Sequence, residues 1–386
     1  MGARKLYYED SHIKVFEATV TGCEPQKGGF AVTLDATAFY PEGGGQACDT
    51  GTLGDAKVLS VREQGEEIHH LCDKPLAVGT AVTGAIDWPQ RFYRMQQHSG
   101  EHMVSGIVHQ KYGYHNVGFH MGADVITIDF DGPIPQEDLQ ALEDTVNEAI
   151  WQNLPVRCWY PTEEELPSVN YRRKKDLPWP VRIVEFPGID LCACCGTHVQ
   201  YTGEIGLVKL FSCVKFHEGV RIEMACGKQA LDILNDAYGQ NRLVSQAFSA
   251  KPNQTGLAAK RMNEALTVEK FRATGLEKRL FAYIARDYAG LALALHFEEG
   301  LTPNANRELC DCLADNCTVA VALSGTDETG YSLCIISRTE DVKALGASAV
   351  KALRGRGGGK PNAFQGSVTA TRREIEAFFS DLPSAQ

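Results

Sequence analysis

The 386-residue sequence predicts an α+β protein built of four consecutive parts. Short apolar runs broken by Gly and Pro indicate strands in the first part. Strand-like runs mix with amphipathic helices in the second, and the third has helical apolar spacing almost throughout. A chain of this length also exceeds one typical domain. The predicted parts are a small β-barrel over 1–88, a two-layer α+β domain over 89–226, a helical hairpin spacer over 227–285 and an α/β domain over 286–386.

The first part predicts a barrel because its strands are short and closely spaced. Val15–Val20 and Gly29–Asp35 alternate or run apolar between turn residues. Glu42–Gln46, with the sequence EGGGQ, predicts a loop whose glycines permit close backbone approach or a positive φ. A plain hairpin turn is the alternative interpretation. A Walker loop is excluded because no Gly-Lys-Ser/Thr follows.

The second part opens on a predicted helix that runs to about Tyr112. Asp87 is a suitable N-cap, and Pro89 is tolerated in the first turn. Apolar residues recur at helical spacing along this segment, so His98 and His102 project together from its middle. Gly100 between them costs about 1 kcal/mol of helix propensity relative to Ala. Either a close approach by a substrate or tight packing would explain that glycine.

The rest of the second part alternates strands with a helix. Val125–Phe130 predicts a strand, Pro135–Gln152 an amphipathic helix and Val181–Phe186 another strand, followed by a turn at Pro187 and Gly188. This alternation predicts two layers.

The third and fourth parts carry fewer chemical signals. A break near residues 251–253 divides the spacer into two helices, and the spacer or the C-terminal domain is a candidate homodimer interface. The fourth part predicts strands near 317–323 and 331–337, a helix over 341–353, a basic glycine loop and a final helix over 372–379. Cys310, Cys312 and Cys317 have no nearby His, which favours core packing over metal binding.

Charge and cysteine content restrict the function classes. A net charge of −11 argues against binding nucleic acid by bulk attraction, because phosphates require Lys and Arg facing them. Candidates for a local basic surface are the Arg172–Lys175 run and a cluster of Lys351, Arg354, Arg356 and Lys360, with a solvated face as the alternative. No secretory leader and no membrane-spanning apolar run is evident, so the 13 cysteines predict a cytoplasmic chain without disulfides.

Two short pairs carry the strongest chemical signal. His98-x3-His102 and Cys194-x3-His198 each place two ligand types on one helix face or in one turn. Together they offer three imidazoles and a thiolate, a donor set that suits Zn²⁺ better than Mg²⁺ or Ca²⁺. The alternative is that the two histidines only share a helix face and that Cys194 is an ordinary buried thiol.

Four sequence stretches sharpen this hypothesis. They are FYPEGGGQ at 39–46, RMQQHSGEH at 94–102, CACCGTHV at 192–199 and RGRGGGKP at 354–361. In this order, they resemble the alanyl-tRNA editing proteins of the AlaX type, which are free-standing relatives of the editing half of alanyl-tRNA synthetase. The resemblance covers nearly the whole chain. The long form of that family carries a C-terminal DHH-associated domain, for which residues 286–386 leave room.

The resemblance implies a zinc-dependent hydrolase that removes serine, with glycine as a further substrate, from mischarged tRNA(Ala). By analogy, His98, His102, Cys194 and His198 hold the metal and form the catalytic site, whereas Cys195 is not a ligand. The residues leave alternatives open. One is a tRNA-binding protein whose zinc is purely structural, and another is a zinc hydrolase with a different aminoacyl ester preference.

Further residues are candidates for substrate contacts. A site that accepts serine and rejects alanine needs a polar group for the seryl hydroxyl, and Asn116, Gln46, Thr37 and Thr197 are candidates. Glu101 lies about 100° around the helix from His102, which favours a solvent-facing carboxylate over a general base. In the C-terminal domain, Arg356 and Lys360 stand beside glycines, a pattern that suits phosphate contact. No Asp-His-His triplet occurs, so the phosphoesterase half of that superfamily is absent.

Overall fold

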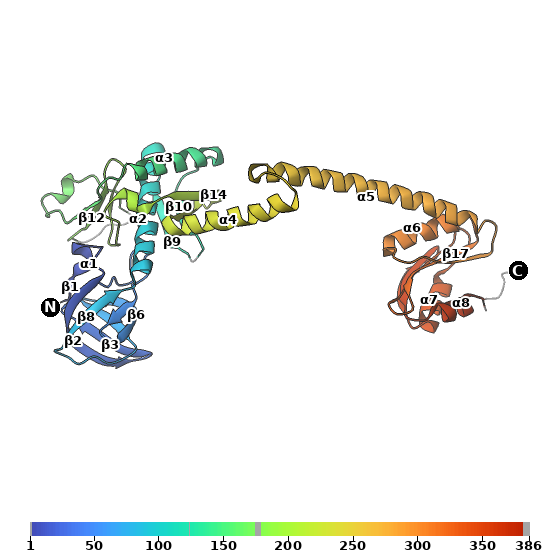
Figure 1. The fold of residues 1–386 in the computed structure, drawn as a ribbon, viewed down its shortest axis with the longest axis horizontal. Coiled ribbons are helices and arrows are strands. Elements are labelled where there is room, and N and C mark those ends of the chain that lie inside the picture. The colour runs from blue at the N-terminus through green and yellow to red at the C-terminus, as the bar shows by residue number, and fades with distance from the viewer. Residues whose placement is uncertain (1, 123, 174–178, 381–386) are drawn as a thin grey trace. The chain divides into compact units, whose positions relative to one another are not determined.

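The computed structural model describes residues 2–122, 124–173 and 179–380, and it divides into two compact units, Met1–Arg242 and Leu243–Gln386 (Figure 1). Helices and strands are mixed in both units, so the predicted α+β class is confirmed. The four predicted domain boundaries are finer than this division and stay predictions. Of the described helices, none combines the length and the apolar character needed to cross a membrane.

The first unit begins with a closed barrel in the strand order β2-β3-β7-β6-β5-β8. Alternate side chains of these strands point inward and are buried, which gives the barrel its own apolar core. The loop 42–46 leaves this barrel between two strands. The strands are β2 (Val15–Gln26), β3 (Gly29–Leu34), β5 (Gly51–Leu53), β6 (Ala56–Gln64), β7 (Glu67–Cys72) and β8 (Ala81–Ile86), and beside them lie α1 (Leu6–Glu9) and the parallel pair of β1 (Arg4–Lys5) with β4 (Ala36–Thr37).

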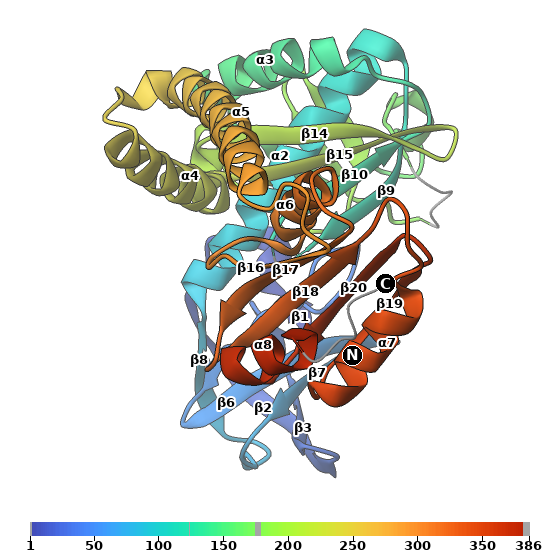
Figure 2. The same cartoon turned by 90° about the vertical axis from the view of Figure 1, so that its right-hand side faces the viewer.

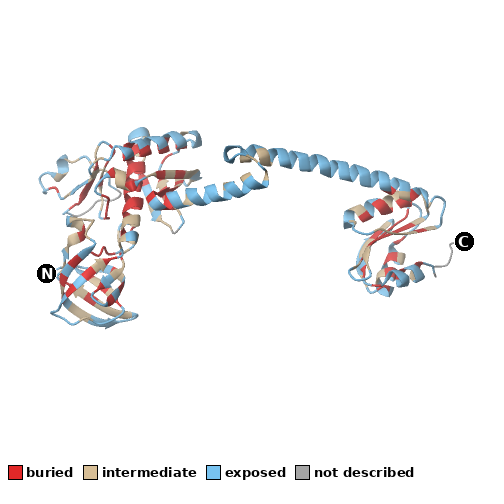
Figure 3. Ribbon diagram, viewed as in Figure 1, coloured by how far each residue is buried: buried red, intermediate tan, exposed pale blue. Residues whose placement is uncertain are grey.

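Helix α2 (Trp88–Tyr112) follows the barrel and agrees with the prediction in both of its ends. The Asp87 carboxylate accepts the Gln90 N–H at 3.3 Å, Pro89 occupies the first turn, and Gly113 ends the helix at a φ of +75°. Every residue from 95 to 108 is buried, as the red middle of α2 in Figure 3 shows. The helix therefore runs through the middle of the domain and does not lie on its surface.

Two antiparallel sheets and one further long helix pack around α2. The larger sheet has the order β14-β15-β10-β9 and the smaller one the order β11-β12-β13. The elements are β9 (Asn116–Met121), β10 (Ile126–Phe130), α3 (Leu139–Trp151), β11 (Arg157–Trp159), β12 (Ile183–Phe186), β13 (Asp190–Ala193), β14 (Val208–Phe216) and β15 (Gly219–Cys226), with short 3-10 turns at Gln136–Asp138, Leu166–Ser168 and Thr202–Ile205.

The predicted spacer is helical. Helices α4 (Gly227–Ala247) and α5 (Thr255–Arg286) are separated by a 3-10 turn at Pro252–Gln254, close to the predicted break. The homodimer interface assigned to this region, or to the C-terminal domain, stays a prediction.

The second unit is organised around a five-stranded sheet in the order β16-β17-β18-β20-β19. Alternate residues of β17 point to opposite faces: Ala320 and Ala322 pack with α5 and α6, whereas Val321 and Leu323 pack with α7 and α8. Figure 2 shows α7 and α8 across the near face of this sheet. The elements are β16 (Leu293–Phe297), α6 (Pro303–Ala314), β17 (Val319–Thr326), β18 (Gly330–Ile336), α7 (Lys343–Ala352), β19 (Arg356–Lys360), β20 (Ala363–Val368) and α8 (Arg372–Ser380).

Of two sequence predictions for this unit, one is confirmed and the other is wrong. Core packing of the cysteines is confirmed, because Cys310 is fully buried and Cys312 and Cys317 pack against the same cluster. The predicted basic glycine loop is wrong, since Arg356–Lys360 form the edge strand β19, antiparallel to β20. A Cβ at Gly357 or Gly359 would crowd the backbone of β20, so these glycines permit close pairing of the two strands.

Candidate metal centre

Helix α2 supplies two imidazoles from one face. His98 and His102 stand one turn apart, with ring centroids 5.3 Å apart and the rings nearly parallel. At Gly100, between them, a Cβ would overlap the Sγ of Cys226 on β15. Tight packing of the helix against that strand therefore explains the glycine, and no approach by a substrate is needed.

The turn after β13 supplies the second pair, Cys194 and His198. Arg182 fixes this turn, because its Nη1 donates to the carbonyls of Cys194 and Gly196 at 3.0 Å each. A Cβ at Gly196 would overlap the His98 ring, so a glycine is needed for the turn to reach α2. The Val199 N–H donates to Ser99 Oγ at 3.1 Å and connects the turn directly to the helix.

The four predicted ligands come together. One donor atom from each of His98, His102, Cys194 and His198 lies within 4.8 Å of the others, and Cys194 Sγ is 3.3 Å from His98 Nε2. His102 Nε2 and both ring nitrogens of His198 are buried without a hydrogen-bond partner in the described chain. Buried polar atoms without partners are costly, and a metal would satisfy them. The donor set of nitrogen and sulfur therefore fits zinc.

The Nδ1 atom of His98 contacts a neutral partner, the amide of Gln46. Gln46 Oε1 lies 3.0 Å from His98 Nδ1 and also accepts the Thr197 N–H at 3.2 Å. Gln46 Nε2 donates to Thr197 Oγ1 at 2.8 Å. An acceptor at Nδ1 holds the proton there and leaves Nε2 free to bind a metal. Gln46, predicted as a substrate contact, thus orients the His98 ring. Thr197, predicted in the same role, holds Gln46 in place.

The outer nitrogen of His102 contacts a charged pair that the sequence did not reveal. Asp190 Oδ2 lies 2.8 Å from His102 Nδ1, and Arg172 holds the same carboxylate through two bonds of 2.7 and 2.8 Å. The Asp190 and Arg172 side chains are 1% and 9% exposed. The only sequence signal was an aspartate inside the apolar stretch Ile189–Cys192. Arg172 is therefore not part of a basic surface, which corrects the prediction for this run; Lys174 and Lys175 lie outside the described residues.

The electrostatics favour a metal-binding thiolate. Burial alone would raise the pKa of the Cys194 thiol, but the surrounding imidazoles hold it well below its ordinary 9.0. Burial works to lower the pKa of His102, yet the Cys194 thiolate and Asp190 raise it to about 10. Burial lowers the pKa of His198 to about 3, which keeps that ring neutral. A thiolate and a neutral imidazole are the forms that bind metal ions, so Cys194 and His198 already have the binding form, whereas His102 would release a proton on binding a metal.

Glu101 and Asn116 form a buried network next to the histidines. Asn116 Nδ2 donates to Glu101 and, at 3.1 Å, to Ser105 Oγ, and Ser105 Oγ donates to Glu101 Oε1 at 2.7 Å. The expectation of a solvent-facing Glu101 is wrong, because the residue is 3% exposed. An angle around a helix places a side chain on a face, but here every face of α2 is covered. The sequence offered one signal for this contact: Glu101 and Ser105 are four residues apart and are therefore neighbours on the helix.

The remaining predicted residues lie elsewhere. Thr37 is buried in the barrel, 2.8 Å from His70 Nε2, so it is a core residue and not a substrate contact. Arg356 and Lys360 are exposed on β19, in the second unit. Cys195, the non-ligand neighbour of Cys194, is exposed.

A pocket of about 260 Å³ opens on the metal centre. Besides His98, His102 and Cys194, its lining includes Glu101, Phe119 and Gly44 of the glycine loop. The pocket therefore brings a candidate metal-binding group, a buried carboxylate and an apolar ring around a space of small-molecule size.

The chain is similar to several known proteins. A protein-family model described as the threonyl and alanyl tRNA synthetase second additional domain matches residues 181–223. The alanyl-tRNA editing protein Aarsd1 of Rattus norvegicus is 28% identical over 411 residues, which cover 99% of this chain and 98% of that protein. The alanine–tRNA ligase of Thermofilum pendens is 30% identical over 391 residues, which cover 96% of this chain and 42% of the ligase.

A solved structure also matches part of the chain. The C-Ala domain of Aquifex aeolicus alanyl-tRNA synthetase covers 24% of this chain and 91% of that domain, with 22% identity and a TM-score of 0.22, a likeness too small to bear on the fold. The sequence relatives are thus alanyl-tRNA editing proteins, matched over nearly their whole length, and alanine–tRNA ligases, matched over part of theirs. The chain is an AlaX-like relative of the alanyl-tRNA editing proteins, and the resemblance found in the sequence is confirmed.

Proposed function

We propose that the chain is a zinc-dependent trans-editing hydrolase that removes serine, or glycine, from mischarged tRNA(Ala). The observation that carries the proposal is the convergence of His98, His102, Cys194 and His198 beside a small pocket. The names of the full-length relatives support the substrate class. In this proposal, residues 89–226 form the editing domain and residues 286–386 the tRNA-binding domain.

The residues in and around the pocket have separate tasks in this function. When bound, zinc supplies a Lewis acid that polarises an oxygen of the ester. Gln46 and Asp190 hold the rings of His98 and His102 in orientation through their outer nitrogens. Phe119, whose ring lies 5.5 Å from that of His98, limits the volume left for the acyl group. A buried, small site favours a small amino acid over a large one.

Asn116 is our candidate for reading the seryl hydroxyl. Its amide nitrogen is fixed by Glu101 and Ser105, whereas its Oδ1 is buried without a hydrogen-bond partner in the described chain. A seryl hydroxyl that donates to Oδ1 would satisfy that acceptor, and alanine would leave it unsatisfied.

Deacylation tests the proposal. Zinc-loaded protein is mixed with tRNA(Ala) carrying serine, glycine or alanine, and the ester remaining is followed over time. We expect rapid loss of serine with alanine retained, loss of activity with a chelator and recovery with zinc. Cys194→Ala should lose zinc and activity, whereas Cys158→Ala, an exposed thiol on β11, should lose neither. Full metal content with no deacylation would favour the alternative, a tRNA-binding protein with a structural zinc.

The tRNA body is assigned to the second unit. Arg356 and Lys360 lie on an exposed edge strand whose glycines leave the backbone accessible. Replacing both by Ala should weaken tRNA binding and reduce the slope of log affinity against log salt by up to about two. Arg338→Ala is the control, because that guanidinium already pairs with Asp311 and Asp315. An unchanged slope in the double variant would rule out this face.

A further inference from the structure

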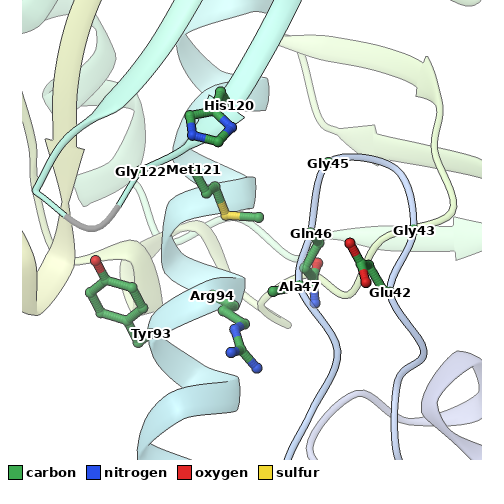
Figure 4. A pocket seen from close by; sticks show the side chains of 10 residues that line it. All are labelled: Glu42, Gly43, Gly45, Gln46, Ala47, Tyr93, Arg94, His120, Met121 and Gly122. Atoms are coloured by element: carbon green, nitrogen blue, oxygen red, sulfur yellow. The ribbon is translucent and has the colours of Figure 1, made fainter. Parts of the chain in front are cut away.

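A second pocket lies beside the metal centre, across the glycine loop. It has a volume of about 480 Å³, in the range that binds small molecules. Figure 4 shows its walls: Tyr93 and Arg94 come from α2, His120 and Met121 from β9, and the loop 42–47 closes the opposite side. Of the residues that we assign to the metal centre, Gln46 alone lines this pocket.

The glycine loop separates the two pockets. Gly44 lines the smaller pocket at the metal centre, whereas Gly43, Gly45 and Gln46 line the larger one. Arg94 stands four residues before His98 on the same face of α2, so about 6 Å of helix axis separates this lining residue of the larger pocket from the first candidate metal ligand. A molecule whose reactive end lies at the metal centre can therefore extend across the loop.

The loop is fixed in place, yet its three central residues, Gly43 to Gly45, carry no side chain. Tyr40 Oη donates to the Gly43 carbonyl at 3.1 Å, and Gly43 and Gln46 exchange backbone bonds of 3.0 and 2.9 Å. At Gly44, with a φ of +59°, a Cβ would meet nothing nearer than Tyr40 Oη at 4.0 Å. Packing therefore does not require a glycine at 44. Its backbone conformation does, and the missing side chain leaves that edge of the smaller pocket open.

The walls of the larger pocket suit a nucleoside. Tyr93 and His120 offer aromatic rings from two different elements, and a base can stack on such faces. Arg94 also lines the pocket, and its Nη1 donates to the Cys48 carbonyl and lies 3.9 Å from Asp49 Oδ1. The exposed Glu42 adds an acceptor at the rim.

A pocket on another side of the metal centre is closed off from it. That pocket, of about 470 Å³, is lined by His109, His115 and Arg173. Arg172 lines both it and the pocket at the metal centre, and its two bonds to Asp190 form a buried wall. Opening this wall would break a buried ion pair, which is strongly unfavourable. The exit across the glycine loop requires no such change.

We infer that the pocket of Figure 4 binds the terminal nucleoside of the acylated RNA, with Tyr93 and His120 against the base. This inference rests on the proposed function, because an aminoacyl ester at the metal centre is joined directly to the ribose of that nucleoside.

Two measurements on the zinc-loaded full chain test the inference. The first is steady-state deacylation of seryl-tRNA(Ala) by Tyr93→Ala, Tyr93→Phe and His120→Ala. The second is equilibrium binding of adenosine 5′-monophosphate. The matched control is His115→Ala, which removes an exposed imidazole from the closed-off pocket. Circular dichroism and zinc content establish that each variant is folded.

We expect Tyr93→Ala and His120→Ala to raise KM at least about fivefold with kcat within twofold of the wild type, since each loses a stacking partner. Tyr93→Phe should keep the wild-type KM, because it keeps the ring, and so should His115→Ala. Unchanged KM in both pocket variants, or a larger effect of His115→Ala, would overturn the inference even if the enzyme edits.

The nucleotide measurement separates the two claims. If the wild type deacylates nothing, the proposed function fails, but binding of adenosine 5′-monophosphate that is lost in Tyr93→Ala would still support a nucleoside pocket. Absence of deacylation together with nucleotide binding that Tyr93→Ala leaves unchanged would overturn both.

Discussion

The Nδ1 atoms of His98 and His102 contact different partners. His98 has the neutral amide of Gln46, whereas His102 has Asp190, which is itself held by Arg172. A carboxylate behind a ligating histidine fixes the ring and raises its basicity, and it typically contributes one to two orders of magnitude in metal affinity. Of the two partners, Asp190 should therefore matter more for the affinity than Gln46.

Asp190→Asn tests this difference. The amide keeps an acceptor near His102 but leaves Arg172 without its carboxylate, so we expect the zinc dissociation constant to rise at least about tenfold. Competition with a chelating dye measures it. Asp131→Asn is the control, because that carboxylate makes an exposed pair with His115 away from the metal. Equal affinities of the two variants would remove Asp190 from the metal centre.

His70 makes the stability of the first unit depend on pH. Its Nδ1 contacts the Val32 carbonyl at 3.0 Å and its Nε2 contacts Thr37, so the buried ring is neutral and satisfied. Burial lowers the pKa of His70 from 6.5 to about 4. The unfolded chain therefore binds a proton that the folded chain does not, and stability falls as pH drops from 6.5 towards 4, by about 3 kcal/mol in all.

Urea unfolding at pH 7 and pH 5 measures this effect. The tryptophans, at 88, 151, 159 and 179, all belong to the first unit, so their fluorescence reports that unit alone. We expect His70 to contribute about 2 kcal/mol to the loss between these pH values, and His70→Gln to reduce the loss by that amount. His69→Gln, at the neighbouring, partly exposed position, should keep the wild-type dependence. Equal pH dependence in both variants would contradict the assignment.

At the scale of helices and strands, the sequence correctly predicted the features that depend on neighbouring residues alone. The start of α2 followed from Asp87 and Pro89, because capping acts within one turn, and its end near Tyr112 followed from the helical spacing of the apolar residues. The strand β19 could not be predicted, since glycines have low strand propensity and this strand exists through pairing with β20. The burial of Glu101 depends in the same way on sheets that surround α2 from distant parts of the chain.

Gly100 shows how closely α2 fits its surroundings. Gly100→Ala should strengthen the isolated helix by about 1 kcal/mol, yet the new Cβ overlaps Cys226, and overpacking costs about 1–3 kcal/mol. We therefore expect that Gly100→Ala does not raise the free energy of unfolding, and that it lowers this free energy if β15 cannot shift. The urea transition by tryptophan fluorescence measures it.

Two further variants isolate the cause. Gly239→Ala, on α4 with open space around it, should not lower stability. Gly100→Ala combined with Cys226→Ala should be more stable than the sum of the two single effects, because the removed sulfur makes room for the methyl group. Strict additivity would show that the contact with Cys226 is not the reason for the glycine.

At the scale of the whole molecule, chemistry and RNA binding are assigned to different units. The metal centre and both pockets beside the glycine loop lie within the first unit, whereas Arg356 and Lys360 lie in the second. Each unit has apolar clusters of its own, so neither needs the other to bury its core.

Dividing the chain into two fragments after residue 250 tests this separation of tasks. The fragment 1–250 keeps α4 and should fold, bind zinc and deacylate seryl-tRNA(Ala) with a kcat near that of the full chain, but with KM raised because the basic strand is lost. The fragment 251–386 should bind tRNA with a salt-dependent affinity and deacylate nothing. Single-turnover kinetics at saturating RNA separate the chemical step from binding. If fragment 1–250 binds zinc fully yet is inactive at every RNA concentration, the second unit takes part in the chemistry itself, and the assignment of the two tasks to two units is wrong.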